Sequence, residues 1–194
     1  CRRPVYKAGG GTGDDGMRPR VIRKDSVYCA SQIKDLLQSL FAAEFICPSS
    51  HLWLVSAWVS DIPVLDNTGM DFAGISSGWG ARSLRLSEVL VELAGQGSTV
   101  IVVTNNDLHN EAFKQRLLMK AEMVGVRERV HAFEKEVLHT KALLGDTYYL
   151  DGSMNFTQNG IQVNDETVKL VLDPNDVQTA RIDYLDRYKP PDLA

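Results

Sequence analysis

The sequence lacks the features that would assign it to several common protein classes. It has only three cysteines in 194 residues, and Cys1, Cys29 and Cys47 do not have the spacing of a metal site. No apolar run approaches the ~18 residues that cross a bilayer, and no charged-then-apolar leader opens the chain. These absences favour a cytoplasmic protein with reduced thiols, and they argue against a zinc domain, a disulfide-rich scaffold and a membrane protein.

An excess of positive charge is also absent. Acidic residues outnumber basic residues by 25 to 21, and the formal net charge is −4. The chain as a whole therefore does not attract nucleic acid or an anionic membrane. If its substrate is a polyanion, a local cluster of cations must bind it. Hydrophobic residues make up 44% of the chain, which is sufficient for the core of one domain.

The apolar pattern divides the chain into an arm and a single domain. Residues 1–20 contain five glycines among charged residues and show no apolar periodicity, so they are predicted to form a flexible arm. Residues 21–194 form the domain, and no internal repeat is found in it. Residues 61–80 are rich in glycine and predict a long loop. The arm and this loop are the two candidate docking segments for further protein partners.

Strands and helices alternate in the remainder of the domain. Continuous apolar runs at 52–58 and 99–104 predict strands that are buried on both faces. Apolar residues at helical spacing predict helices at 27–45, 84–93 and 108–123. This alternation predicts an α/β fold in which helices flank a mixed β-sheet.

One short segment holds the residue types that phosphodiester chemistry needs. His139 and Lys141 are two residues apart, so on a strand they share a face. The chain then turns at Asp146 and returns to Ser153 and Asn155, which also share a face if the backbone is extended. Such a hairpin places a nucleophile, a cation and neutral hydrogen-bond donors at one end of a sheet. A lone histidine on a strand usually has a structural role, and it is the joint spacing that favours a site.

The segment resembles the HKD motif of the phospholipase D superfamily, which reads H-x-K-x(4)-D followed by G-S-x-N. His139, Lys141 and Asp146 match the first part, and the acidic residue that follows in many members has a match in Glu166. Weaker similarity extends over most of the chain from about residue 26. The resemblance implies a phospholipase-D-like catalytic domain over residues 21–194. The second part of the motif is matched by Gly152, Ser153 and Asn155.

A single motif in the chain resembles the short branch of this superfamily, which includes bacterial metal-independent endonucleases and a restriction enzyme domain. That branch implies a homodimer with one shared active site, no metal and no cofactor. His139 would form a phosphohistidine while a second His139 protonates the leaving oxygen. Lys141, Ser153 and Asn155 would stabilise the phosphoryl oxygens, and Glu166 would orient His139. Asp146 would anchor the hairpin.

The resemblance leaves the substrate open. A nuclease is the favoured function, with a role in bacterial DNA restriction or phage defence. The alternatives are a phospholipase D or phosphatidyl transferase, although no membrane-docking segment is visible, and a dimeric scaffold without activity. Trp58 and Ser60, at the end of the first strand, are candidates for the substrate cleft, although Trp58 also suits a core. Arg82, beside the Gly-rich loop, is a further candidate, although an arginine in such a loop is usually only exposed to solvent.

Overall fold

A computed structural model describes residues 18–24 and 27–190 of the chain. The strands are β1 (Arg20–Lys24), β2 (His51–Val55), β3 (Pro63–Asp66), β4 (Ser83–Arg85), β5 (Thr99–Thr104), β6 (Val130–Glu134), β7 (Ala142–Leu144), β8 (Tyr149–Gly152) and β9 (Glu166–Val171). The helices are α1 (Val27–Ile46), α2 (Leu86–Gly95), α3 (Glu111–Met123), α4 (Gln158–Gln162) and α5 (Pro174–Arg187). Short 3₁₀ turns lie at Ser77–Trp79, Leu108–Asn110 and Arg127–Arg129.

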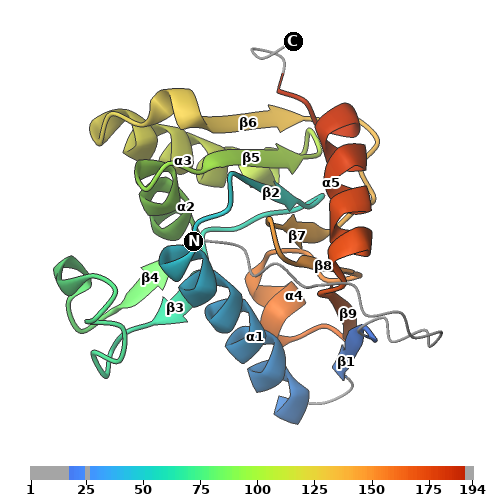
Figure 1. The fold of residues 1–194 in the computed structure, drawn as a ribbon, viewed down its shortest axis with the longest axis horizontal. Helices are drawn as coiled ribbons and strands as arrows, with labels where there is room; N and C mark the ends of the chain where they lie inside the picture. Colours follow the sequence, from blue (N-terminus) through green and yellow to red (C-terminus); the bar gives the residue numbers. More distant parts are fainter. Residues whose placement is uncertain (1–17, 25–26, 191–194) are drawn as a thin grey trace, which may run out of the picture.

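Seven of these strands form one mixed sheet in the order β1-β9-β8-β7-β2-β5-β6, which runs from the bottom to the top of Figure 1. β2, β5 and β6 are parallel to one another. β7 is antiparallel to β2, and each remaining pair in the sheet is also antiparallel. The expected mixed sheet with flanking helices is therefore confirmed.

Helices cover both faces of this sheet, which explains the continuous apolar runs. In β2, Leu52 and Leu54 belong to a core shared with α1, α2 and α3, while Trp53 and Val55 face the core under α5. Each of these side chains is fully buried. Because neighbouring residues of a strand point to opposite faces, a strand between two helical layers is apolar at every position. In Figure 1, α5 lies on the right, α2 and α3 lie on the left, and α1 lies below.

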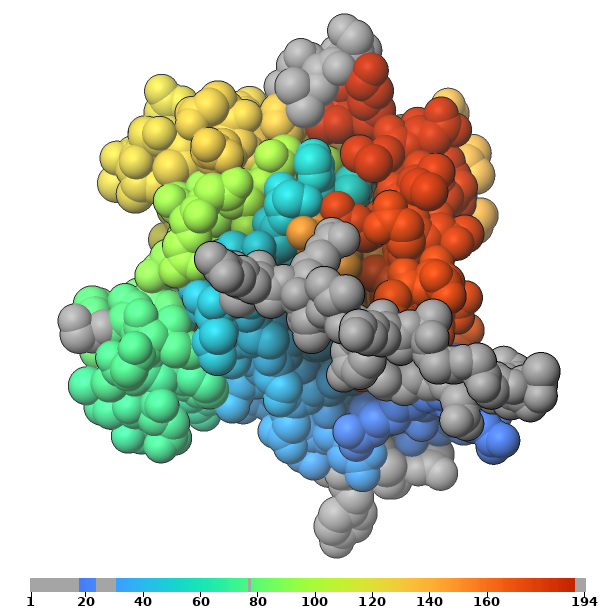
Figure 2. Space-filling model, viewed as in Figure 1, coloured from blue at the N-terminus to red at the C-terminus, as the bar shows by residue number. Residues whose placement is uncertain are grey.

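The prediction of a long open loop at residues 61–80 is wrong in part. The segment contributes β3, which pairs with β4 in a separate two-stranded sheet. Trp79 is buried, packs edge-on against Phe45 with ring centroids 4.7 Å apart, and donates its indole N–H to Glu92 at 2.6 Å. Buried Asn67 ties the segment together through the Gly80 carbonyl. The segment forms the green lobe at the lower left of Figure 2.

The predicted arm lies mostly outside the described residues, since the description begins at residue 18. Arg20 at its end already belongs to β1, which pairs antiparallel with β9. Within the described part of the chain, no helix combines the length and the apolar character that crossing a bilayer requires.

Candidate active site

All the motif residues except Asp146 gather at one edge of the main sheet, where its strands β2 and β8 end. β7 begins at Ala142, which pairs with Val55 at the end of antiparallel β2. Residues that precede β7 therefore lie beside residues that follow β2. β8 is antiparallel to β7 and ends at Gly152, so the residues after it reach the same edge. Four chain segments thus meet where the sheet ends, because β9 also begins there at Glu166.

His139 and Lys141 directly precede β7 rather than lying on it, so the expectation that they belong to a strand is wrong in this detail. The pairing with β2 ends at Ala142, and beyond it the Lys141 carbonyl accepts a single bond from the Gly152 amide at 3.2 Å. The Lys141 ammonium donates to the His139 backbone carbonyl at 2.8 Å. The His139 side chain is exposed, and in the described structure neither of its ring nitrogens has a hydrogen-bond partner. The imidazole is therefore accessible, and the Lys141 ammonium is held at the backbone of the same residue.

Ser153 and Glu166 form a pair on the β9 side of the hairpin. The Ser153 hydroxyl donates to the Glu166 carboxylate and accepts from the Thr167 amide at 3.0 Å. Glu166 is 8% exposed, and Asn164 lies 3.5 Å from its other oxygen. The expected bond between Glu166 and His139 is not among the contacts of the described residues. In this arrangement Glu166 orients the Ser153 hydroxyl.

Asn155 reaches the opposite side of the hairpin, toward the end of β2. Its side-chain oxygen accepts from the Ser56 hydroxyl at 3.1 Å and from the Trp58 amide at 3.4 Å. Because these bonds fix the oxygen, the amide NH₂ group is the part of Asn155 that remains for a ligand. Ser153 and Asn155 were expected to share a face, but the sharp turn after Gly152 directs them to β9 and β2 respectively.

Trp58 lies on the surface at this edge. Its side chain is 42% exposed, so the alternative reading of Trp58 as a core residue is wrong. The indole N–H donates to Asp107 at 3.1 Å, and hydrogen bonds from the His109 amide and then from this indole lower the pKa of the Asp107 carboxyl. Ser60 lies 2.9 Å from the Nε2 of His109.

Ser56, Asp107 and His109 carry no motif, and sequence reasoning did not assign them to the site. A signal was nevertheless present, because β2 and β5 are consecutive buried strands of an α/β pattern. The carboxyl ends of parallel strands meet at one edge of a sheet. Residues 105–110, which follow β5, were therefore predictable neighbours of residues 56–61, which follow β2.

Asp146 lies at the other end of the hairpin, away from His139. It accepts from the Ser50 amide at 3.1 Å and from the Ser50 hydroxyl at 3.0 Å. Its own amide donates to Ser49 at 2.7 Å, and its carboxylate forms an ion pair with Arg181. These contacts tie the hairpin turn to the start of β2 and to α5, as an anchoring residue would.

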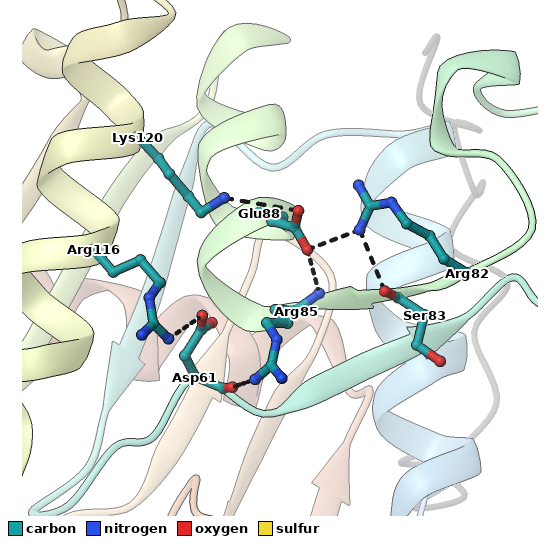
Figure 3. A pocket seen from close by; sticks show the side chains of 7 residues that line it. All are labelled: Asp61, Arg82, Ser83, Arg85, Glu88, Arg116 and Lys120. Carbon is teal, nitrogen blue, oxygen red and sulfur yellow. Dashed lines mark hydrogen bonds and ion pairs between the residues drawn. The ribbon is translucent and has the colours of Figure 1, made fainter.

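Arg82 is not among the motif residues. It lies in a separate charged pocket beside β4, where its guanidinium donates to Glu88 at 3.1 Å. Figure 3 shows this pocket. Asp61, which lines the pocket, directly follows Ser60 in the chain, so the pocket and the site are neighbours. Within the described residues, no group of three or more His, Cys, Asp or Glu side chains is placed to hold a metal ion.

The site brings together an exposed imidazole, an ammonium, a hydroxyl and a carboxamide. This set suits attack on a phosphoryl centre, because the imidazole can act as a nucleophile while Lys141 and Asn155 donate to developing negative charge. The single proton of the Ser153 hydroxyl is donated to Glu166. Two histidines of one chain lie at this edge among the described residues. His109 has a hydrogen-bond partner in Ser60, so within the described structure His139 is the one whose ring nitrogens remain unpartnered.

Comparison with protein families gives one match. The model described as "Cardiolipin synthase, PLD-like domain" matches residues 81–186, which is more than half of the chain. A comparison with curated protein sequences finds no match.

Several solved structures share the fold. Nuc from Salmonella typhimurium, a phospholipase D family member, is 11% identical with a TM-score of 0.56, and the alignment covers 89% of this chain and 95% of Nuc. NucT from Helicobacter pylori is 12% identical with a TM-score of 0.53, covering 87% of this chain and 94% of NucT. Phosphatidylserine synthase from Haemophilus influenzae is 11% identical with a TM-score of 0.51, covering 87% of this chain and 36% of the synthase.

Proposed function

The chain belongs to the phospholipase-D-like domain family, and from that premise we propose that it is a metal-independent nuclease that cleaves phosphodiester bonds through a phosphohistidine. The observation that carries the proposal is the arrangement of the motif at one sheet edge. His139 is exposed there beside the Lys141 ammonium, and Asn155 is held by Ser56 with its NH₂ group directed away from that bond.

The residue types account for each chemical step. An imidazole nitrogen of His139 attacks phosphorus, a P–N bond forms, and the bond from phosphorus to the leaving oxygen breaks. A second imidazole gives its proton to that oxygen, and afterwards accepts a proton from the water that breaks the P–N bond. Two imidazoles can share one proton near neutral pH, so one is a nucleophile while the other is an acid. Lys141 and Asn155 offset charge on the phosphoryl oxygens, while the Ser153 hydroxyl is held by Glu166 and Thr167 at the edge of the site.

The second imidazole belongs, in this proposal, to another copy of the same chain. A two-fold dimer brings the same surface of both copies together, so it places two copies of the exposed His139 edge face to face. Because these 194 residues hold one motif, we assign the nucleophile to one copy of the chain and the acid to the other.

The choice of nucleic acid over lipid rests on how the chain compares with whole proteins of each kind. The alignment covers almost all of the two nucleases, 95% of Nuc and 94% of NucT, but only 36% of the lipid enzyme phosphatidylserine synthase. A phospholipase D or phosphatidyl transferase activity is the second candidate, because the matching family model carries the name of cardiolipin synthase. We extend the nuclease proposal to bacterial DNA restriction or phage defence by fold-level analogy.

One assay separates these functions. Purified protein is incubated in EDTA with single-stranded DNA, duplex DNA, RNA and phosphatidylcholine vesicles in parallel, with His139→Ala as the control. We expect at least one nucleic acid to be cleaved by the native protein and none by the variant, because the cationic work falls to Lys141 and the imidazoles rather than to a metal. Cleavage of lipid alone would favour the second candidate, and equal activity of His139→Ala would place the site elsewhere.

A further inference from the structure

A charged cavity of about 440 Å³ opens between β4, α2, α3 and the segment that follows β2. Figure 3 shows how its side chains converge from these elements. Arg116 and Lys120 are one turn apart on α3, and Arg85 ends β4. The lining residues are Asp61, Arg82, Ser83, Arg85, Glu88, Arg116 and Lys120.

Cations outnumber carboxylates in this cavity by four to two, although the whole chain carries a net charge of −4. The Asp61 side chain is only 3% exposed, and it accepts from Arg116 and from the Ser87 amide, each at 2.9 Å. Glu88 accepts from the Arg85 amide at 2.9 Å. The two carboxylates therefore position the cations, and a positive charge excess of two remains.

The cations stay available to a ligand. The Arg85 amide together with Arg82 and Lys120 outweighs burial and holds the pKa of the Glu88 carboxyl below its ordinary value, so Glu88 stays ionised and keeps these cations in place. Part of each guanidinium nevertheless remains exposed. The side chains of Arg82 and Arg116 are 51% and 45% exposed. The Arg85 guanidinium donates to the Asp61 backbone carbonyl, and in the described structure it has no carboxylate partner. Several guanidinium N–H groups can therefore bind an anion without breaking an ion pair.

The cavity is a short distance from the proposed active site. The Trp58 amide contacts Asn155, and Asp61 is three residues further along the chain, a span of at most ~11 Å. The Ser60 amide donates to the Phe156 carbonyl at 2.8 Å, which fixes this segment beside the motif. Since each nucleotide of a duplex strand advances by about 3.4 Å along the axis, the cavity lies within about three nucleotides of Asn155.

We propose that this basic pocket binds a backbone phosphate of the nucleic-acid strand whose scissile bond lies at His139. The inference rests on the proposed nuclease function and names the surface that draws a polyanion to an acidic protein. Guanidinium groups favour phosphate because their planar N–H pairs match two phosphate oxygens. Arg82, whose side chain is 51% exposed, and Arg85, which has no carboxylate partner among the described residues, would make the principal contacts.

The test is DNA binding rather than turnover. The double variant R82Q/R85Q is made in a His139→Ala background, and binding of fluorescent 12-nucleotide single-stranded and duplex DNA is measured by anisotropy over a range of salt concentrations. We expect Kd to rise about tenfold or more, as for the loss of charged hydrogen bonds, and the salt dependence to weaken by about one phosphate contact.

Arg187→Gln is the matched control. The Arg187 side chain is also 51% exposed and forms its own ion pair, with Asp183 at 3.0 Å, but it lies on α5 away from the pocket. This variant should leave Kd and the salt dependence unchanged. The single variant Arg82→Gln, at an exposed position, serves if the double variant melts at a lower temperature.

Each outcome decides the proposal separately from the nuclease function. Unchanged binding by R82Q/R85Q would overturn the pocket, even if native protein cleaves DNA. Loss of binding in that variant alone would support the pocket, even if native protein cleaves nothing and the nuclease function fails. If the parent binds no DNA but binds phosphatidylserine vesicles through these arginines, the phosphate source is lipid and the proposal is wrong.

Discussion

Replacing Gly152 with alanine should damage both the fold and the proposed site, because no side chain fits at this position. Gly152 has a φ of +156°. An added Cβ would lie 2.0 Å from the Thr167 backbone oxygen and 2.9 Å from the Val168 Cα. Ordinary contact begins at 3.4 Å, so β8 and β9 must separate by about 1.4 Å, the difference between 3.4 and 2.0 Å.

That separation acts on contacts that hold Ser153. The Ser153 amide donates to the Thr167 carbonyl at 3.0 Å, and the Thr167 amide donates to the Ser153 hydroxyl at 3.0 Å. Loss of two hydrogen bonds at about 0.5–1.5 kcal/mol each, with overpacking at about 1–3 kcal/mol, gives a destabilisation of about 2–6 kcal/mol. At about 2–4 °C per kcal/mol, the Tm should fall by roughly 10 °C.

The assay compares Gly152→Ala with Gly74→Ala, whose added Cβ would meet nothing within 4 Å. Both changes restrict the unfolded chain equally, so the difference between the Tm values of the two variants measures the clash in the folded state. Thermal unfolding gives the Tm values. Nuclease turnover is measured well below both Tm values and should be about 100-fold slower in Gly152→Ala, because a shift of about 1 Å at a reacting centre has an effect of this size. Equal Tm values for the two variants would refute the close approach of β8 and β9.

Three further outcomes are expected. Lys141→Ala and Asn155→Ala should each slow turnover by about 10²–10³, the scale for removing one donor to a developing oxyanion, and near-normal rates in both would place the site elsewhere. A heterodimer of native and His139→Ala chains, isolated through two affinity tags, should be nearly inactive because it lacks either the nucleophile or the acid. Loss of the acid alone should lower the rate by about 10²–10⁴. Half of the native activity would disprove a shared site. Asp146→Ala should lower the Tm through the lost Arg181 ion pair and Ser50 bonds while the Lys141 contacts persist; an unchanged Tm would show that Asp146 is no anchor.

Much of the fold was predictable because its central strands are buried on both faces. The apolar runs that contain β2 and β5 could not be exposed, and the helical periodicities at α1, α2 and α3 place these elements within a few residues of their observed bounds. β6 was not predicted. It is an edge strand whose first two residues are buried and whose last three are partly buried or exposed, and its sequence carries no continuous apolar run.

The motif was predictable from spacing, and its surroundings were not. His139 and Lys141 lie close together in the chain, so a short pattern identifies them. The partners of Asn155 are Ser56 and Trp58, about 100 residues earlier, and no local pattern encodes that approach. Trp58 illustrates the limit. As a tryptophan that ends an apolar run it suits a core, and only the hydrogen bond of its indole to Asp107 shows why it remains at the surface.

The separation of these partners also bears on how a cell could tolerate such an enzyme while making it. Asn155 is fixed by Ser56 across 99 positions of sequence, and Glu166 follows later still. Synthesis proceeds from the N-terminus, and contacts between distant segments form only once both are present. For the proposed nuclease, a nascent chain attached to its ribosome and messenger RNA would have no complete site until almost the whole domain had emerged. Cutting activity would then begin only when two chains that have both completed this domain meet.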